Sequence, residues 1–440
     1  KVLRALKIKT SVTAPTGIAA NNVRGITTTR FIGARRVMQP KRVQLGVVCE
    51  EEYLHAQVGS EVEMDDETET KTTAFMPVKG KQMFDEGLQS LILDEVSMIS
   101  DFKFQQLEHV VGEVVGAANP FATAVQLILV GDFAQLPAII PSGTPEATAV
   151  NIGQFQRFLF KSKRWSSLNL RTIELTVCKR SQHIEYAKLA CKLRDNLPVN
   201  VASWNAITRL EDANENLAIF GNFTPRGSTR QERDRFPCAS NFNRQRLDRL
   251  PGSWIRLNAE DEQVGDIPVP RNLSDEIWIK RGCRIQLRNT SFNNSAVGIA
   301  NNMCGTVQQV SFSHILAQFF TNNHTSFTFD IPKSKVYSKT TAPPFGRRSS
   351  RSQYSIRVAH GITAHGAQGQ TIHEPFVVQC DQCWDSGHLL VMLSRASDPN
   401  LMRLVNLDHA RPFIAPVVLK FHRQIRTAMQ QRHGRLWYVT

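Results

Sequence analysis

Short apolar runs alternate with stretches of helical periodicity along much of the chain. Two such runs occupy 88–93 and 124–130, and residues 102–115 between them place apolar side chains at helical spacing. A strand, a helix and a second strand in this order are typical of parallel α/β units. A strand-like run at 8–12 and a helical pattern at 185–194 continue the alternation. The pattern therefore predicts an α/β protein.

The pattern changes in the second half of the chain. Between 277 and 329 the runs become short, alternating and separated by turn residues, which predicts a small antiparallel β insertion. The α/β pattern returns at 354. We expect four segments, namely a first α/β domain (1–170) with an acidic surface insertion (39–86), the first part of a second domain (171–275), the β insertion with a basic loop (276–353), and the rest of the second domain with a basic C-terminal extension (354–440).

Length and composition are those of an ordinary globular protein. The chain has 440 residues, 41% hydrophobic and 21% charged, which excludes a mainly disordered protein and allows about three domains of roughly 150 residues. The longest apolar stretch, 125–140, contains Asp132 and Gln135, which a transmembrane helix would not carry at its centre. We therefore expect no membrane partner.

The positive charge is unevenly distributed. Residues 50–70 contain nine acids and no Lys or Arg, which leaves 30 acids against 53 bases in the rest of the chain. Such an excess favours a phosphate-backbone ligand over the alternative, a basic protein without a polyanionic partner. The eight cysteines are irregularly spaced, and the one close pair, Cys380 and Cys383, is interpreted as two reduced thiols, with a redox pair as the alternative. A reducing, intracellular compartment fits this pattern.

The segment 91–98, LILDEVSM, ends an apolar strand on two acids, Asp94 and Glu95. At the carboxyl edge of a parallel sheet, a first acid of this kind organises Mg²⁺ and a second polarises the attacking water in nucleotide hydrolases. The same pair is also compatible with a simple helix N-cap. The next strand ends as GDFAQLP (131–137), in which Gln135 offers an amide that senses a phosphate or a water.

Three further segments carry polar groups next to apolar runs. TAPTGIAA (13–20) offers hydroxyls and turn amides suited to a sugar-phosphate backbone. ITAHGAQGQTI (362–372) and LVMLSRA (390–396) lie near the other end of the chain. An arginine such as Arg395 is either a surface charge or a finger that neutralises a transferred phosphoryl group.

In this order and spacing, the segments resemble the superfamily-one helicases that move 5′ to 3′ on DNA, most of all the PIF type, with the RecD type as cousins. ELTVCKRS (174–181) corresponds to the segment that carries the family's first arginine finger, and 277–310 resembles the entry to its small barrel-like insertion. The resemblance implies two RecA-like parallel-sheet P-loop motor domains with a β-barrel-like insertion in the second. It implies an ATP-dependent DNA helicase that takes part in DNA repair, DNA recombination and telomere maintenance.

The resemblance also assigns roles to residues. Asp94 would hold Mg²⁺ through water, Glu95 would be the general base and Gln135 the γ-phosphate sensor. Arg180 and Arg395 would be the two arginine fingers. The remaining roles are DNA binding by Thr13, Pro15, Thr16, Thr363, His365 and Gln368, and cofactor binding by Gly369. The implied cofactors are ATP and Mg²⁺, and the implied partners are single-stranded DNA and duplex junctions. We expect a monomer inside the cell, in the nucleus or the mitochondrion if the protein is eukaryotic.

The chain departs from the family pattern in its phosphate loop. Only twelve residues precede Thr13, no Gly-Lys-Ser/Thr occurs there, and the sole Gly-Lys, Gly80-Lys81, is followed by Gln82. The backbone cradle and the lysine for the β- and γ-phosphates are therefore missing. We expect a fragment that begins after the loop and hydrolyses ATP poorly by itself. The alternative is a catalytically inactive relative that binds single-stranded DNA, and an RNA helicase of the same superfamily is a weaker third possibility.

Two smaller departures concern the DNA-binding motifs. Thr29 stands where the family has a histidine, in the segment with Gly25, Thr27, Phe31 and Gly33. Where the family often has His-Lys-Ser-Gln-Gly, this chain has His365, Gly366, Ala367, Gln368 and Gly369. The missing lysine removes a positive charge that would contact a phosphate or the other domain.

Overall fold

A computed structural model of the protein describes the residues in the following ranges: 3, 6–32, 34–36, 75–77, 87–140, 147, 150, 156–175, 177–208, 218–220, 239–271, 273–288, 299, 303–311, 314–320, 326–338, 347–381, 383 and 385–433. The chain forms two compact units. Unit 1 consists of Lys1–Val177 together with Ile414–Thr440, and unit 2 consists of Cys178–Phe413. Most of the predicted acidic insertion (39–86) lies outside the described residues.

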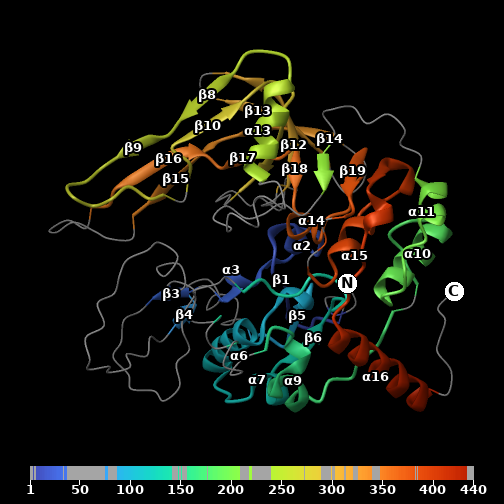
Figure 1. Cartoon of the computed structure of the whole chain (residues 1–440). Coiled ribbons are helices and arrows are strands. Elements are labelled where there is room, and N and C mark those ends of the chain that lie inside the picture. Colours follow the sequence, from blue (N-terminus) through green and yellow to red (C-terminus); the bar gives the residue numbers. More distant parts are fainter. Residues whose placement is uncertain are drawn as a thin grey trace, which may run out of the picture. The chain divides into compact units, whose positions relative to one another are not determined.

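Unit 1 contains a four-stranded parallel sheet in the order β2-β1-β5-β6 (Figure 1). Its strands are β1 (Thr10–Ala14), β2 (Ile26–Thr27), β5 (Ser90–Leu93) and β6 (Gln126–Leu129). In register, Thr13 lies opposite Leu93 and Leu93 opposite Leu129, so the three longer strands end at the same edge. Short helices α2 (Gly17–Asn22) and α3 (Thr28–Ile32) follow β1 and β2, and β3 (Ala34–Arg36) pairs with β4 (Phe75–Pro77).

Helix α6 (Asp101–Val115) connects β5 to β6, as the apolar periodicity of 102–115 predicts. The Ser100 side chain caps its N-terminus by accepting a hydrogen bond from the Lys103 amide, and Gly116 ends it at a φ of 69°. Phe104 and Leu107 of this helix are fully buried. Helices α7 (Pro120–Thr123) and α9 (Lys163–Ser167) and the 3-10 turns η1 (Val96–Met98) and η2 (Leu159–Lys161) complete this part.

The last helix, α16 (Pro416–His433), belongs to unit 1 although it follows unit 2 in the sequence. Its Phe421 stacks on Phe160 with ring centroids 4.2 Å apart and meets Phe133 edge-on at 5.6 Å. Arg426 pairs with Glu174 through two hydrogen bonds of 2.9 and 3.0 Å. The structure thus groups 414–433 with the first domain, whereas the sequence pattern assigns this basic segment to the second.

Unit 2 contains a second four-stranded parallel sheet, in the order β18-β7-β19-β20. Its strands are β7 (Ala218–Phe220), β18 (Gly361–Ile362), β19 (Phe376–Gln379) and β20 (Met402–Val405). The helices of this unit are α10 (Ile184–Arg194), α11 (Val201–Ile207), α13 (Ala239–Arg249), α14 (Ala364–Ala367) and α15 (His388–Leu393), with 3-10 turns η3 (Pro399–Leu401) and η4 (Leu407–His409). The observed α10 agrees with the helix predicted at 185–194.

Three antiparallel sheets form the β insertion of unit 2. Their orders are β14-β13-β12-β11-β17, β15-β16-β9 and β10-β8. The strands are β8 (Ile255–Asn258), β9 (Glu260–Glu262), β10 (Glu276–Ile279), β11 (Arg284–Leu287), β12 (Cys304–Val310), β13 (Ile315–Phe320), β14 (Ser326–Ile331), β15 (Lys333–Tyr337), β16 (Ser350–Tyr354) and β17 (Ile356–Val358). Antiparallel strands occupy the segment 276–353 in which the insertion is predicted, and β8, β9 and β17 from outside these bounds pair with them. Closure into a barrel stays a prediction.

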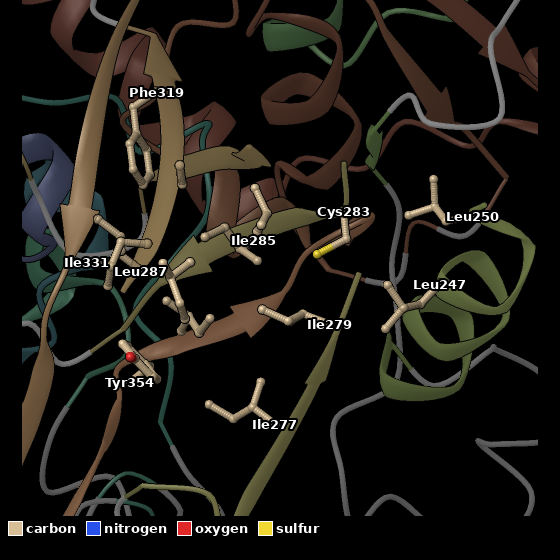
Figure 2. Packing of buried hydrophobic residues seen from close by; sticks show 14 of the residues in the cluster. Leu247, Leu250, Ile277, Ile279, Cys283, Ile285, Leu287, Phe319, Ile331 and Tyr354 are labelled. Atoms are coloured by element: carbon tan, nitrogen blue, oxygen red, sulfur yellow. The ribbon is translucent and has the colours of Figure 1, made fainter. Parts of the chain in front are cut away.

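Apolar side chains from these strands and from α13 share one core (Figure 2). Ile279, Ile285 and Phe319 are fully buried there, beside Leu247 of α13. Alternate residues along β12 and β13 face this core, which matches the two-residue period read from the sequence. The insertion therefore packs as a body within unit 2. In the described part of the chain, none of the helices combines the length and apolarity needed to span a membrane.

Candidate functional site

The turn after β5 holds Asp94 and Glu95 against both neighbouring strands. The Asp94 amide donates to the Thr13 carbonyl at 2.8 Å, and the Val96 amide donates to the Val130 carbonyl at 3.0 Å. Glu95 lies in the left-handed region, with φ 52° and ψ 45°. A non-glycine residue in this region carries strain of order 1–3 kcal/mol and is found disproportionately at functional sites. The two carboxylates thus stand on a fixed, strained turn at the carboxyl edge of the sheet.

Gly131 permits the close approach of β6 to this turn. A Cβ atom at Gly131 would lie 2.8 Å from the Val96 amide nitrogen and 3.1 Å from its Cγ1, and the residue has a φ of 153°. Only glycine accommodates both the backbone conformation and the contact. The glycine of GDFAQLP therefore links this loop to the acidic turn.

The environment of Asp94 suits a cation. Burial raises the pKa of Asp94, and the adjacent charge of Glu95 raises it further. A bound Mg²⁺ would relieve that repulsion, and Mg²⁺ is usually held by one or two carboxylates, waters and substrate phosphates. Within the described ranges, no group of three or more His, Cys, Asp or Glu side chains forms a complete metal cage. A single carboxylate with water therefore fits the donors that are present.

Gln135 stands on a loop built around Asp132. The Asp132 carboxylate accepts the Ala134 amide at 3.1 Å, and its carbonyl accepts the Gln135 amide at 3.0 Å. His422 of α16 lies with Nε2 3.6 Å from the same carboxylate. Next to it, Phe421 contacts Phe133 of the loop. Sequence reasoning missed His422 and Phe421, because nothing in a basic C-terminal segment indicates a partner so far away.

The first DNA-motif residues lie where β1 ends. Thr13 is fully buried, and Pro15 and Thr16 are half-buried. The Thr16 hydroxyl accepts the Ala19 amide at 3.2 Å and so caps α2. A fully buried hydroxyl offers no surface to a nucleic-acid strand. The role of Thr13 that the structure shows is its carbonyl, which accepts the Asp94 amide and so helps to hold the acidic turn. Pro15 and Thr16 remain the predicted DNA contacts of this group.

The segment after α2 is shaped by packing. Gly25 backs onto β1, where a Cβ would lie 2.3 Å from the Val12 carbonyl oxygen. Thr27 pairs with Ala14 in the sheet, and Phe31 is fully buried. Gly33 lies outside the described residues. These positions support the edge of the sheet.

In unit 2, the two predicted fingers lie close to one phenol. Arg180 is exposed and donates from Nη1 to the Ser394 carbonyl at 2.8 Å. Arg395 is fully buried, and its Nε donates to the Val391 carbonyl at 3.0 Å. The Tyr186 hydroxyl donates to the Ala396 carbonyl at 3.3 Å. Burial raises the pKa of Tyr186, and the charges of both arginines oppose that shift.

Arg395 also ties two motifs together. Its Nη1 donates to the Gln370 carbonyl at 3.5 Å, and its own carbonyl accepts the Ile372 amide at 2.8 Å. The segments 362–372 and 390–396, separate in the sequence, therefore form one structural element. Movement of Arg395 would move the turn that carries the predicted DNA contacts.

That turn begins at Thr363, whose hydroxyl accepts the Gly366 amide at 3.1 Å and caps α14. His365 packs edge-on against His388 with ring centroids 5.2 Å apart. Gln368 is 2% exposed, and Gly369 turns the chain with a φ of 80°. The structure thus brings the four residues onto one compact turn. Their contacts with DNA and cofactor stay predictions.

Comparison with known proteins agrees with these features. A family model described as PIF1-like helicase matches residues 52–196. The chain is 25% identical over 340 residues to the ATP-dependent DNA helicase PIF1 of Xenopus laevis, covering 76% of this chain and 49% of that protein. It is 25% identical over 335 residues to the Pif1 helicase of Campylobacter jejuni, covering 72% and 69%. The chain thus spans about half the length of the frog relative.

Solved structures show the same fold. The Pif1 helicase of Candida albicans matches with a TM-score of 0.65 at 21% identity, covering 95% of this chain and 88% of that chain. A Bacteroides Pif1 bound to single-stranded DNA also matches with a TM-score of 0.65, at 17% identity, covering 97% and 90%. The two parallel sheets are accordingly those of two RecA-like domains, as the sequence motifs predict.

Proposed function

The chain is a relative of the PIF1-type helicases, and from that premise we propose that it is the motor part of an ATP-dependent DNA helicase moving 5′ to 3′ on single strands. The observation that carries the proposal is the Asp94–Glu95 turn. It places two carboxylates at the carboxyl edge of β5, held by the Thr13 carbonyl and by the close contact at Gly131. Strained residues are found disproportionately at functional sites, and two carboxylates on such a turn at the edge of the sheet suit hydrolysis chemistry.

In unit 1, Asp94 would hold Mg²⁺ through water and Glu95 would take a proton from the attacking water. When ATP and Mg²⁺ are bound, they supply the phosphoryl group and the charge that organises it. Gln135 would report the γ-phosphate to the loop 131–137. Since that loop is tied to the acidic turn at Gly131, a change at one is transmitted to the other.

In unit 2, Arg180 and Arg395 would stabilise the charge that develops on the transferred phosphoryl group. Arg395 is fully buried and Arg180 is exposed, so the first would need a rearrangement before it reaches a nucleotide. Its bonds to Val391 and Gln370 are to carbonyl oxygens, which exchange for a phosphate more readily than a carboxylate would. Through Gln370, this exchange would reach the turn 363–369, with Gly369 at its end.

Pro15 and Thr16 in unit 1 and Thr363 and His365 in unit 2 would line the track of a single strand, and the buried Thr13 and Gln368 would support the turns that carry them. The partners would be single-stranded DNA and duplex junctions. One solved structure of a related protein shows Pif1 bound to single-stranded DNA, and another concerns two coordinating Pif1 helicases at forked duplex DNA. We propose by analogy with the first of these that this chain binds single-stranded DNA as a monomer inside the cell, in the nucleus or the mitochondrion if the protein is eukaryotic.

A second candidate function is that of a catalytically inactive relative of the same fold that binds single-stranded DNA. It would apply if the protein as a whole had no phosphate loop. The five retained groups Asp94, Glu95, Gln135, Arg180 and Arg395 favour the motor, because a binding module has no chemical need for all five.

DNA-stimulated ATP hydrolysis tests the proposal. The assay compares this chain with a version extended upstream through the next open-frame segment, each with its Glu95→Gln variant. We expect turnover only in the extended protein and its loss in Glu95→Gln. Absence of turnover in both, with single-strand binding intact, would establish the inactive binding relative instead.

A further inference from the structure

Arginines on the insertion strands of unit 2 differ in their partners. Arg284 of β11 forms a two-bond pair with the Glu374 carboxylate, and Arg351 of β16 pairs with Asp261 and Asp275. Arg357 of β17 instead donates from Nε and from Nη2 to the amide oxygen of Gln286, the first at 2.8 Å. Among the described residues, no carboxylate forms a hydrogen bond or an ion pair with Arg357. Within the described ranges, the acceptor of its hydrogen bonds is thus a neutral amide oxygen.

The guanidinium of Arg357 lies against the turn 363–369. Its Nη2 is 3.8 Å from the position of a Cβ at Gly366. Gly366 is the residue at which the related helicase motif has a lysine. The turn thus has no positive side chain at position 366, and the positive side chain of Arg357 from β17 lies next to this position.

We propose that Arg357 supplies, from the β insertion, the positive charge that the turn 363–369 lacks at Gly366, and that it binds a backbone phosphate of single-stranded DNA there. The inference rests on the proposed DNA-binding function and assigns a new residue to it. Arg357 lies in β17, outside the motifs, so the motif pattern does not identify it.

One edge of the Arg357 guanidinium is fixed by Gln286, which orients the group for binding an anion. Gln286 is fully buried, lies opposite Arg357 in the β11–β17 register, and donates from its own amide to Cys304 Sγ at 3.6 Å. This fixes one side of the guanidinium. In the described part of the chain, Nη1 makes no hydrogen bond, and a planar fork with a free edge is the geometry that binds phosphate oxygens.

The electrostatic surroundings point the same way. Burial lowers the pKa of Arg357, and the neighbouring charge of Arg288 lowers it further. Both effects disfavour the charged form, and a phosphate bound to Arg357 would offset them. Arg357 as a whole residue is half-buried rather than fully enclosed.

Space and charge both favour a glycine at position 366. A Cβ at Gly366 would lie 3.3 Å from both Ile362 Cγ2 and Thr363 Oγ1, tighter than ordinary contact. A lysine there would also bring its charge next to the guanidinium. The steric obstacles to a Cβ at 366 are thus Ile362 and Thr363, whereas Arg357 Nη2 at 3.8 Å is at ordinary contact distance. Removal of the arginine relieves the charge conflict with a lysine at 366 and leaves the steric one.

The test measures binding of a fluorescent oligo-dT to this chain by anisotropy, between about 50 and 200 mM salt. Arg357→Gln should weaken binding about tenfold at low salt, because a hydrogen-bonded charge contact to phosphate is lost. The slope of log K against log salt should fall by about 0.7, the value for one phosphate contact on a single strand. Arg403→Gln, which removes one charge from an exposed position of β20, serves as the matched control and should leave both quantities nearly unchanged.

The double variant Arg357→Gln/Gly366→Lys distinguishes a relocated charge from a structural role. It should regain most of the lost affinity and the salt slope, while Gly366→Lys alone should gain nothing. Arg357→Lys should stay within about threefold of the wild type, and thermal melts identify any variant that misfolds.

The proposal is overturned if Arg357→Gln binds like Arg403→Gln, or if it loses affinity with an unchanged salt slope. It is also overturned if Arg357→Lys, folded, loses the slope. Wild-type protein that fails to bind oligo-dT at any salt would overturn the proposed DNA-binding function together with this inference. Wild-type binding with an indifferent Arg357→Gln would overturn only the assignment of Arg357.

Discussion

The two parallel sheets carry different chemistry and hold it in different ways. In unit 1 the acids Asp94 and Glu95 stand directly on the sheet, fixed by main-chain bonds to Thr13 and Val130 and by the contact at Gly131. In unit 2, Arg395 is fixed by its long side chain, which reaches carbonyl oxygens of other segments. The acids are thus positioned by main-chain hydrogen bonds, whereas the buried arginine is positioned by hydrogen bonds of its own side chain.

This difference follows from the task proposed for each group. A metal-holding acid needs an unchanging place, which a strained turn beside a glycine provides. An arginine that meets developing charge needs a place that it can leave, and neutral carbonyl partners permit that. The comparison predicts that mutations act locally in unit 1 and on several segments at once in unit 2.

Replacement of Arg395 should have the largest effect. In the upstream-extended protein, Arg395→Ala should lower DNA-stimulated ATP turnover about 10³-fold, the lower range for loss of an arginine finger. It should also loosen the turn 363–369, because the bond to Gln370 is lost, and so weaken DNA binding. Turnover and oligo-dT binding are measured side by side. Arg180→Ala, at an exposed position, should lower ATP turnover and leave oligo-dT binding unchanged. If the two variants lose DNA binding equally, the proposed difference between Arg180 and Arg395 is wrong.

Acidification should weaken unit 2 selectively. His360 is buried near Arg284 and Arg246, and burial with these charges lowers its pKa from 6.5 to about 4. The unfolded chain therefore binds a proton at higher pH than the folded one, so stability is intact above pH 6.5 and falls as pH drops toward 4. At about 1.4 kcal/mol per pKa unit, the loss reaches ~3 kcal/mol.

Urea unfolding at pH 7 and pH 4.5 measures this loss. His360→Gln keeps an acceptor for the Arg284 amide, which donates to His360 Nε2 at 3.4 Å, but cannot titrate. The variant should show a flatter pH profile. An identical profile would mean that other groups control the acid response.

Removal of Phe421 should weaken unit 1. Phe421→Ala deletes a half-buried ring that stacks on Phe160, so we expect ~2–3 kcal/mol, below the ~3–5 kcal/mol of a fully buried phenylalanine. Trp165 lies 5.8 Å from the ring and reports the change by fluorescence during urea unfolding. Phe413→Ala, 47% exposed, is the control and should cost under about 0.5 kcal/mol.

The smallest effect should come from Gly131→Ala. The new Cβ would press on the Val96 amide, at a cost of about 1–3 kcal/mol. Gly116→Ala also replaces a glycine of positive φ, at 69° rather than 153° and into open space, so it gives the cost of a left-handed backbone without a contact. Chemical denaturation gives both values. Equal costs would show that the acidic turn does not depend on this glycine.

The sequence predicts the edges of the sheets well because their motifs are local. Asp94, Glu95 and Gln135 follow apolar runs that form β5 and β6, and parallel strands bring their carboxyl ends to one edge. Helix 102–115 was predictable for the same reason, since its periodicity is contained in the segment itself.

Features that depend on distant partners could not be predicted. Nothing in the segment around Phe421 indicates Phe133 or Phe160, and the burial of Thr13 depends on two neighbouring strands. The position of Arg357 opposite Gln286 also arises from the pairing of β11 with β17. Motif patterns identify residue types at a site, whereas the side chains that support it come from pairing and packing.

Helix α16 has a consequence for the order in which the protein is made. Glu174 and Arg426 lie 252 positions apart, so a ribosome adding about 5–20 residues per second completes this pair roughly 10–50 s after Glu174 is joined to the chain. During that delay the whole of unit 2 is synthesised and free to fold. In unit 1, the rings of Phe133 and Phe160 lack their contact with Phe421 until α16 has been synthesised. The part of the protein that begins first is therefore finished last.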